Sequence, residues 1–310
     1  MTSRWFLLGL LSTACACQEA PGPSATGAGG ASGLKIPRSS PSSEEAVRQR
    51  AESVEKSLNP QGLPLYSGPV GGVRGVITVG GDPAPLVPGR ASKIPETCPR
   101  ALDLERKLFR QGVDRTLADV LVTVTEYQGY IKPQTDSVRV DVKGCAFGAK
   151  VLALVYGQRI DVFNRDPEGY LPRLIGVPAY TLRVAMPGGN PVPVFPPSPG
   201  QFLLAEETRD YMRSEVYVLN YPTFDVTALD GAFEISGVPV GDVKVTAYSP
   251  ALGKVSEQRL KIQSGVTQEL KFQLDFSQAE YEATLRKKAE ATATSSAGQA
   301  GSNGAGGTGG

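Results

Sequence analysis

The chain has 310 residues, and its 32 lysines and arginines against 31 aspartates and glutamates leave a formal net charge of only +1. This balance leaves no large excess of positive charge that would bind nucleic acid, so we expect no nucleic-acid partner. Histidine is absent, which excludes a serine–histidine–aspartate triad and a histidine-ligated zinc site. The length accommodates two ordinary domains.

Residues 1–17 have the pattern of an export signal. Arg4 precedes the apolar run "WFLLGLL", which is followed by the small residues "STACAC". The run is far shorter than the roughly 20 residues that span a bilayer. Two lipidation sites are consistent with the sequence: Cys15, which ends "LSTAC", and Cys17, which follows "ACA". We expect a lipoprotein, and ordinary cleavage with secretion is the alternative.

The next segments are predicted to be a tether and a helix. Residues 18–41 are rich in Pro, Gly and Ser and cannot bury enough apolar surface to fold, so they are expected to be disordered. A short helix is predicted over residues 42–60, because Ser42 and Glu45 form a capping box and Asn59-Pro60 ends the apolar periodicity. We expect this helix to pack on the sandwich that follows. A helix that binds a partner is the alternative.

From Val73 onward the hydrophobic pattern has a period of two. Short runs rich in Val and Tyr, separated by Gly and Pro turns, predict an all-β fold of sandwich type. The expected strands lie in residues 73–81, 118–127, 137–145, 150–164, 181–189, 200–207 and 214–222.

A second block of alternating residues follows, over residues 224–274. Asp230-Gly231 is a hairpin signal. The block is marginal for independent folding and is expected to pack on the first one. A capping box at Ser277 and Glu280 predicts a helix over residues 277–292, and the Gly-rich tail 293–310 is expected to be disordered.

Export would place Cys98 and Cys145 in an oxidising compartment, where two cysteines tend to pair. We therefore expect a disulfide between them. The alternative is two separate buried thiols.

Two stretches resemble known families. "DVKGCAFGAKVLALVYGQRIDVFNRDP" is similar to the cupredoxin-like domain of exported bacterial proteins of the plastocyanin-like or methylamine-utilisation-like type, in the "KGC" turn (143–145), the "YGQ" turn (156–158), the "NRDP" corner (164–167) and "AMPGG" (185–189). "TALDGAFEISGVPVGDVKVTAYSPALGK" resembles the carboxypeptidase regulatory-like domain, a transthyretin-like sandwich, through its signature from Asp230 to Gly241. The resemblance implies two consecutive β-sandwich domains, over residues 70–222 and 223–275.

The cupredoxin-like resemblance also implies where copper ligands would stand. Tyr170 occupies the place of a histidine after the "NRDP" corner, while Glu206 and Arg209 occupy those of a cysteine and a second histidine. Lys150 lies at a further position where relatives can carry histidine. A blue-copper site needs a thiolate and two imidazoles, and Met212 alone remains as a soft ligand. The resemblance thus implies a fold that is kept and a metal that is lost, with no cofactor.

The loop "AEETRDYMRS" (205–214) then needs another explanation. Its charged residues are expected to form ion pairs at the surface, where such pairs contribute little stability. A calcium site from Glu206, Glu207 and Asp210 is the sharper alternative. It is disfavoured because adjacent residues at a strand end point to opposite faces.

Other candidate groups have simpler explanations. Asp161, Asp166 and Glu168 could supply paired glycosidase carboxylates, but acidic residues are common in loops. The proline-rich segment 192–201 suits a rigid connector better than a docking segment. Five tyrosines could form an aromatic platform for sugar or protein, although most are expected in the core: Tyr127, Tyr130, Tyr156, Tyr170 and Tyr180.

Together these features predict a non-catalytic, metal-free lipoprotein of the bacterial envelope, at the outer membrane, in the periplasm or on the cell surface. It would be attached to the membrane through its lipid and would bind another envelope protein or a polysaccharide. Loops on a rigid sandwich are where binding concentrates, and the expected surface consists of Tyr170, Arg173, Glu206, Arg209 and Tyr211. Two alternatives remain: a copper or electron-transfer protein that uses Met212 and carboxylates, and a carbohydrate-binding module or enzyme.

Overall fold

The computed structural model describes residues 43–177 and 183–300. The chain divides into two compact units, Met1–Ser43 and Glu44–Gly310, and the fold described here is that of the second. The export signal with Cys15 and Cys17, the tether 18–41, Tyr180 and the tail 301–310 lie outside the described residues. No helix of the described part is both long enough and apolar enough to cross a membrane.

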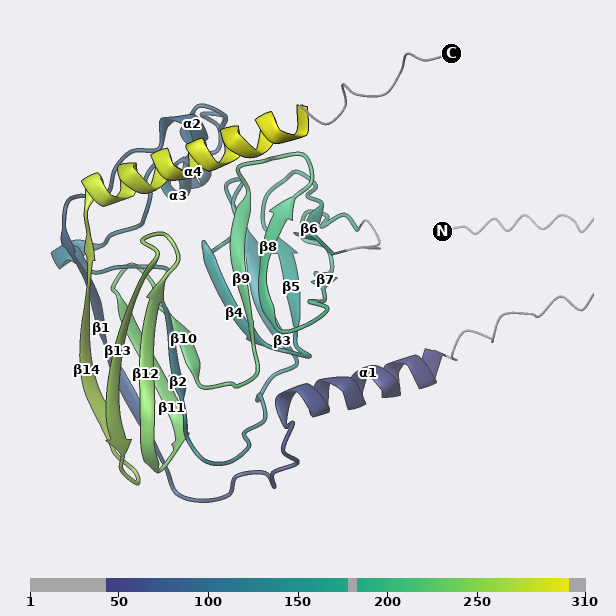
Figure 1. Cartoon of the computed structure of the whole chain (residues 1–310). Coiled ribbons are helices and arrows are strands. Elements are labelled where there is room, and N and C mark those ends of the chain that lie inside the picture. The colour runs from purple at the N-terminus through teal and green to yellow at the C-terminus, as the bar shows by residue number, and fades with distance from the viewer. Residues whose placement is uncertain (1–42, 178–182, 301–310) are drawn as a thin grey trace, which may run out of the picture. The chain divides into compact units, whose positions relative to one another are not determined.

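The fold is all-β and contains two sandwiches (Figure 1). The host sandwich has sheets ordered β11–β1–β14 and β10–β2–β12–β13. Its core lies between these sheets and includes Val73, Val122, Val243 and Phe272. Its strands are β1 (Val70–Gly81), β2 (Leu121–Thr125), β10 (Phe224–Val226), β11 (Ala232–Pro239), β12 (Gly241–Ser249), β13 (Lys254–Ile262) and β14 (Thr267–Phe276).

The inserted sandwich has sheets ordered β3–β5–β7 and β4–β9–β8–β6, with a second core that includes Val140, Leu154, Ile160 and Leu204. Its strands alternate buried and exposed positions less regularly, because β4 is buried along its whole length. Its members are β3 (Ser137–Val142), β4 (Val151–Val155), β5 (Arg159–Asn164), β6 (Pro172–Ile175), β7 (Val192–Val194), β8 (Gly200–Glu206) and β9 (Arg213–Leu219).

The two sandwiches are nested in the sequence, and the strand pairing does not follow the expected boundary between residues 222 and 223. β1 pairs in parallel with β14, from Gly72 opposite Thr267 to Gly81 opposite Phe276. β2 pairs with β12 and with β10, where Phe224 lies opposite Thr123. The first two strands of the expected first domain therefore belong to the host sandwich. The inserted sandwich lies between β2 and β10, which are antiparallel neighbours.

The turn at Asp230-Gly231 forms, but it does not make a hairpin. Gly231 has φ +67°, a conformation that favours glycine, and a Cβ at this position would lie 2.5 Å from the carbonyl oxygen of Ile77. The turn leads from β10 in one sheet to β11 in the other. The expected strand over 181–189 is also absent from its described part: Ala185 forms only an isolated bridge to Tyr170, and Pro187 and Gly188 then turn the chain.

Both flanking helices are confirmed. α1 (Ser43–Leu58) ends before Asn59-Pro60, and its Val54 and Leu58 pack against the core of the inserted sandwich. α4 (Gln278–Ala300) begins after Ser277, whose Oγ accepts a hydrogen bond from the Glu280 amide at 3.4 Å. It runs beyond the expected end at 292 because residues 289–297 are rich in alanine, the strongest helix former.

The segment between β1 and β2 carries three short helical turns, α2 (Pro88–Ala91), α3 (Pro99–Glu105) and a 3-10 turn (Val113–Arg115). The predicted disulfide is confirmed: Cys98, just before α3, bonds to Cys145, with Cα atoms 5.4 Å apart. It therefore links a segment of the host sandwich to the turn between β3 and β4.

Candidate functional site

The "NRDP" corner after β5 is organised around the carboxylate of Asp166. Its Oδ1 accepts a hydrogen bond from the Gly144 amide at 2.7 Å, and its Oδ2 accepts one from the Cys145 amide at 2.9 Å. Both donors have positive φ, so this carboxylate stabilises an unusual turn beside the disulfide. Burial raises the pKa of Asp166, but these hydrogen bonds, that of Tyr170 and the charge of Lys143 outweigh it, so the pKa is lowered overall.

Tyr170 connects the corner to Ala185, in the segment between β6 and β7. Its hydroxyl donates to Asp166 Oδ2 at 2.8 Å, and its backbone exchanges two hydrogen bonds with Ala185. The side chain is only 1% exposed. Burial, followed by the hydrogen bond to the Asp166 carboxylate, raises the pKa of Tyr170, so the phenol stays neutral and acts as a donor.

Glu206, the last residue of β8, is buried and organises the loop that follows. Its Oε2 accepts hydrogen bonds from the amides of Thr208 (2.8 Å) and Arg209 (2.7 Å) and from the Thr208 hydroxyl (2.9 Å). Its Oε1 accepts one from the amide of Leu171 at 3.1 Å. The expectation of an exposed charge is therefore wrong for Glu206. Its buried carboxylate accepts hydrogen bonds from four donors that would otherwise need water as their acceptor.

Arg209 lies over the site. Its guanidinium carbon is 4.7 Å from the centre of the Tyr170 ring, and its nitrogens lie 2.6 Å from Glu168 and 3.6 Å from Glu206. Met212 is 1% exposed, in the core, and its backbone closes the loop with Glu206 and Arg209.

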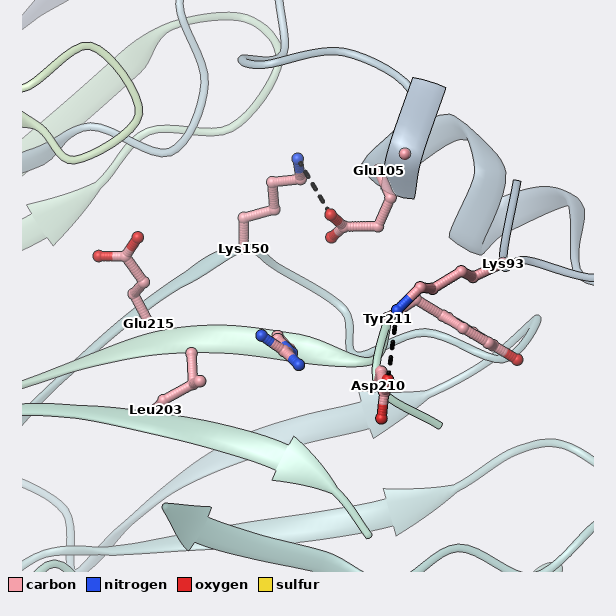
Figure 2. Close-up of a pocket in the computed structure, with 9 residues that line it drawn as sticks. Lys93, Glu105, Lys150, Leu203, Asp210, Tyr211 and Glu215 are labelled. Atoms are coloured by element: carbon pink, nitrogen blue, oxygen red, sulfur yellow. Dashed lines mark ion pairs between the residues drawn. The ribbon is translucent and has the colours of Figure 1, made fainter. Parts of the chain in front are cut away.

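Tyr211 follows in the same loop and lines a cleft of about 300 Å³ (Figure 2). Its hydroxyl lies 3.8 Å from the sulfur of Cys98. Two ion pairs bridge α2–α3 and the inserted sandwich here, Lys150 with Glu105 at 3.8 Å and Lys93 with Asp210 at 3.6 Å. Both signs of charge line the cleft.

The structure brings together only part of the expected recognition surface. Tyr170 and Glu206 are buried, so they support the surface but cannot provide contact area. Arg173, which pairs with Glu207, and Arg209 and Tyr211 are partly exposed. The prediction that Glu206 and Glu207 point to opposite faces is confirmed, since Glu206 is buried while Glu207 is exposed and pairs with Arg173.

The three carboxylates proposed for calcium do not converge. Glu206 holds its own loop, Glu207 pairs with Arg173, and Asp210 pairs with Lys93. Across residues 43–177 and 183–300, no group of three acidic or cysteine side chains could hold a metal ion.

The other candidate groups also separate. Asp161 pairs with Arg159, while Asp166 and Glu168 serve the corner and Arg209. Four of the five candidate tyrosines lie in the described residues: Tyr130, Tyr156 and Tyr170 are buried and Tyr127 is partly buried, so these four form no exposed platform. Sequence reasoning missed the structural role of Asp166 and that of Asn164, whose Oδ1 accepts the Asp166 amide at 2.8 Å. The "NRDP" corner was the available signal.

No family model and no curated protein matches this chain. Among solved structures, a Cu-containing nitrite reductase from Thermus scotoductus SA-01 is similar at 19% identity, covering 31% of this chain and 25% of that one, with a TM-score of 0.24. Amicyanin from Paracoccus versutus is similar at 15% identity, covering 32% of this chain and 97% of that one, also with a TM-score of 0.24. Likeness at this level establishes neither a shared activity nor a shared metal site.

Proposed function

We propose that this protein is a non-catalytic component of the bacterial cell envelope, attached by a lipid at Cys15 or Cys17, whose inserted sandwich binds or positions a partner without using a metal. The proposal rests on one observation. At the positions where the cupredoxin-like resemblance places copper ligands, Tyr170, Glu206 and Arg209 contact one another or the same loop, and their polar groups are engaged.

This arrangement favours a rigid loop over a metal site. Both oxygens of Glu206 accept hydrogen bonds, and a metal ion could displace them only by leaving the donors of Leu171, Thr208 and Arg209 unpaired. Met212, the soft side chain of this loop, is 1% exposed and lies in the core. A rigid loop next to a cleft of mixed charge is suited to recognising a partner by shape and charge.

The first test is copper loading. The full chain, exported to a bacterial periplasm and purified without chelator, is exposed to Cu(II) and to Cu(I), and its metal content and visible absorption are measured. We expect no stoichiometric copper and no thiolate-like band. Copper retained by the wild type and lost in Met212→Leu would establish the alternative of an unconventional copper site.

Membrane attachment is tested in the same host. We expect the full chain to fractionate with membranes, and the double variant Cys15→Ser, Cys17→Ser to become soluble. Release of the wild type into the soluble fraction would instead indicate ordinary secretion.

A further inference from the structure

A basic hollow lies on another part of the inserted sandwich, where the sandwich is open at its side. β3 and β4 are edge strands of the two facing sheets, and residues from both line a hollow of about 590 Å³. Arg139 and Lys143 come from β3 and the turn after it, Arg100 from α3, and Arg165 from the end of β5. Four cations from three parts of the chain therefore converge on one space.

One carboxylate, Asp141, faces these four cations in the lining. Its oxygens accept a two-point contact from Arg139, each at 2.9 Å, and a hydrogen bond from Arg165 at 2.7 Å. The nearest hydrogen-bond acceptor of Arg100 is the carbonyl of Gly148, at 3.5 Å. In a chain of net charge +1, this concentration of positive charge would attract and orient an anionic partner.

The two arginines are held in place before any partner arrives. The guanidinium carbons of Arg139 and Arg165 lie 4.2 Å and 5.5 Å from the ring centre of Phe163. Their side chains are 53% and 44% exposed, so their remaining donors can reach a ligand. Asp141 already accepts hydrogen bonds from both guanidinium groups, so their positions suit the binding of a carboxylate.

The edge of β3 is open beside these cations. β3 pairs with β5 on one side, and no strand of the described residues pairs with its other side. Phe147 covers that side at Val142, through an isolated bridge, and Gly148 lies beside Asp141, since a Cβ added there would lie 3.5 Å from the Asp141 carbonyl oxygen. The stretch from Ser137 to Val140 is thus available to an added strand, which would gain backbone hydrogen bonds.

The two faces of such a strand would meet different surroundings. One face of the added strand would lie beside Val140 and Leu152, which are buried and line the hollow. The other face would lie beside Arg139 and Arg165. A segment in which acidic and apolar residues alternate matches both faces, since side chains alternate along a strand.

The chain itself offers no such segment outside the described residues, where Glu19 is the only acidic residue. Pairing of two β3 edges from two copies would bring two sets of four cations to one seam, with a single lining carboxylate, Asp141, from each copy, and such an excess of like charge is destabilising. We propose that the open edge of β3 binds an extended acidic segment of a partner protein by strand addition, with its carboxylates on Arg139 and Arg165. This goes beyond the function proposed above and does not depend on the lipid or on the absence of copper.

The test uses a fluorescent peptide, acetyl-EVEVEVE-amide, titrated with the full chain and followed by anisotropy. Two control peptides separate the contributions. Replacing every glutamate by glutamine removes the charge, and replacing the central residue by proline removes a backbone donor and the extended pairing. We expect both control peptides to bind about tenfold more weakly or not at all.

Three variants locate the site. Arg139→Thr keeps a strand-forming residue, and Arg100→Met lies outside the sheet, so the test survives if one of them misfolds. Each is expected to weaken binding about fivefold. Arg259→Thr is the matched control and should bind as the wild type does, because Arg259 lies on the edge strand β13 of the host sandwich, is 71% exposed and makes a two-point contact with a carboxylate, that of Glu126. Thermal melts establish that each variant is folded.

The proposal is wrong if the acidic peptide does not bind, if either control peptide binds equally well, or if Arg139→Thr and Arg100→Met behave like Arg259→Thr. Vesicles containing phosphatidylglycerol are tested in parallel. Retention on vesicles that depends on Arg139, without peptide binding, would assign the surface to a lipid membrane and would also overturn the proposal.

Discussion

The side chain of Glu206 accepts four hydrogen bonds on two oxygen atoms and is 1% exposed. A charge at that depth is tolerated because its donors replace the solvent that burial removes. Three of these donors belong to Thr208 and Arg209, and the fourth is the amide of Leu171, the residue just before β6. The carboxylate thereby fixes both the path of the loop and its position against β6.

We predict that Glu206→Ala lowers the free energy of unfolding by about 3 kcal/mol, because it leaves buried donors without an acceptor. Asp210→Ala is the control in the same loop. Its side chain is 67% exposed and its pair with Lys93 is open to water, so that change should cost less than about 1 kcal/mol. Urea denaturation measures both. Equal effects would show that Glu206 does not hold the loop.

At this scale the sequence singled out the loop 205–214 but did not predict the roles of the residues within it. Alternation along β8 predicted that Glu206 and Glu207 point in opposite directions, and they do. It could not tell which of the two is buried, since that depends on Leu171, which is 35 residues away and aligned only by the pairing of β6 with β8.

Among the secondary-structure elements, α1 shows how a helix of polar composition is held. It packs through Val54 and Leu58, and Arg50 lies 5.0 Å from the ring centre of Phe195. The surface of the inserted sandwich that α1 contacts includes the turn at Gly157. There φ is +97°, and an added Cβ would lie 2.6 Å from Val54 Cγ1. The close approach of helix and turn therefore requires glycine.

We predict that Gly157→Ala destabilises the protein by at least about 1 kcal/mol more than Gly176→Ala. Both glycines have positive φ, so both variants carry the same kind of backbone strain, but an added Cβ at Gly176 has no atom within 4 Å. The difference isolates the contact with α1. Hydrogen exchange should show faster exchange of the α1 amides only in Gly157→Ala, and unchanged α1 protection would contradict the prediction.

Most elements were predictable because strand and helix periods are local properties. The periods predicted β1, β2, β8, β9 and both flanking helices. What they could not supply is the partner of each strand, and so Asp230-Gly231 indicated a hairpin where the chain passes from one sheet to the other.

The nesting of the two sandwiches is a property of the whole molecule. β2 and β10 are adjacent and antiparallel, so the inserted sandwich occupies the place of a hairpin loop. A chain cut between residues 222 and 223 would separate β1 and β2 from every strand with which they pair. No alternation pattern reveals this, because β1 and β14 are nearly the whole fold apart in sequence.

We predict that residues 223–310, produced alone, do not fold, and that in residues 42–222 the inserted sandwich folds while β1 and β2 stay unpaired. Residues 61–128 joined to 221–300 by a short Gly/Ser linker should fold, because the joined ends are neighbours and the core of the host sandwich is retained. Circular dichroism and thermal melting measure cooperativity in each. A cooperative transition in the fragment 223–310 would contradict the pairing of β1 with β14.

The parallel pairing of β1 with β14 also sets the order of events during synthesis. β1 emerges from the ribosome early, yet its partners β11 and β14 are made last. At a synthesis rate of 5 to 20 residues per second, on the order of ten seconds pass between the synthesis of β1 and that of β14. The strands β3 to β9 form one continuous stretch, so the inserted sandwich can complete itself within that interval. Its two ends then hold β2 close to the newly made β10. β1, the first strand to be synthesised, is thus among the last to gain its sheet partners.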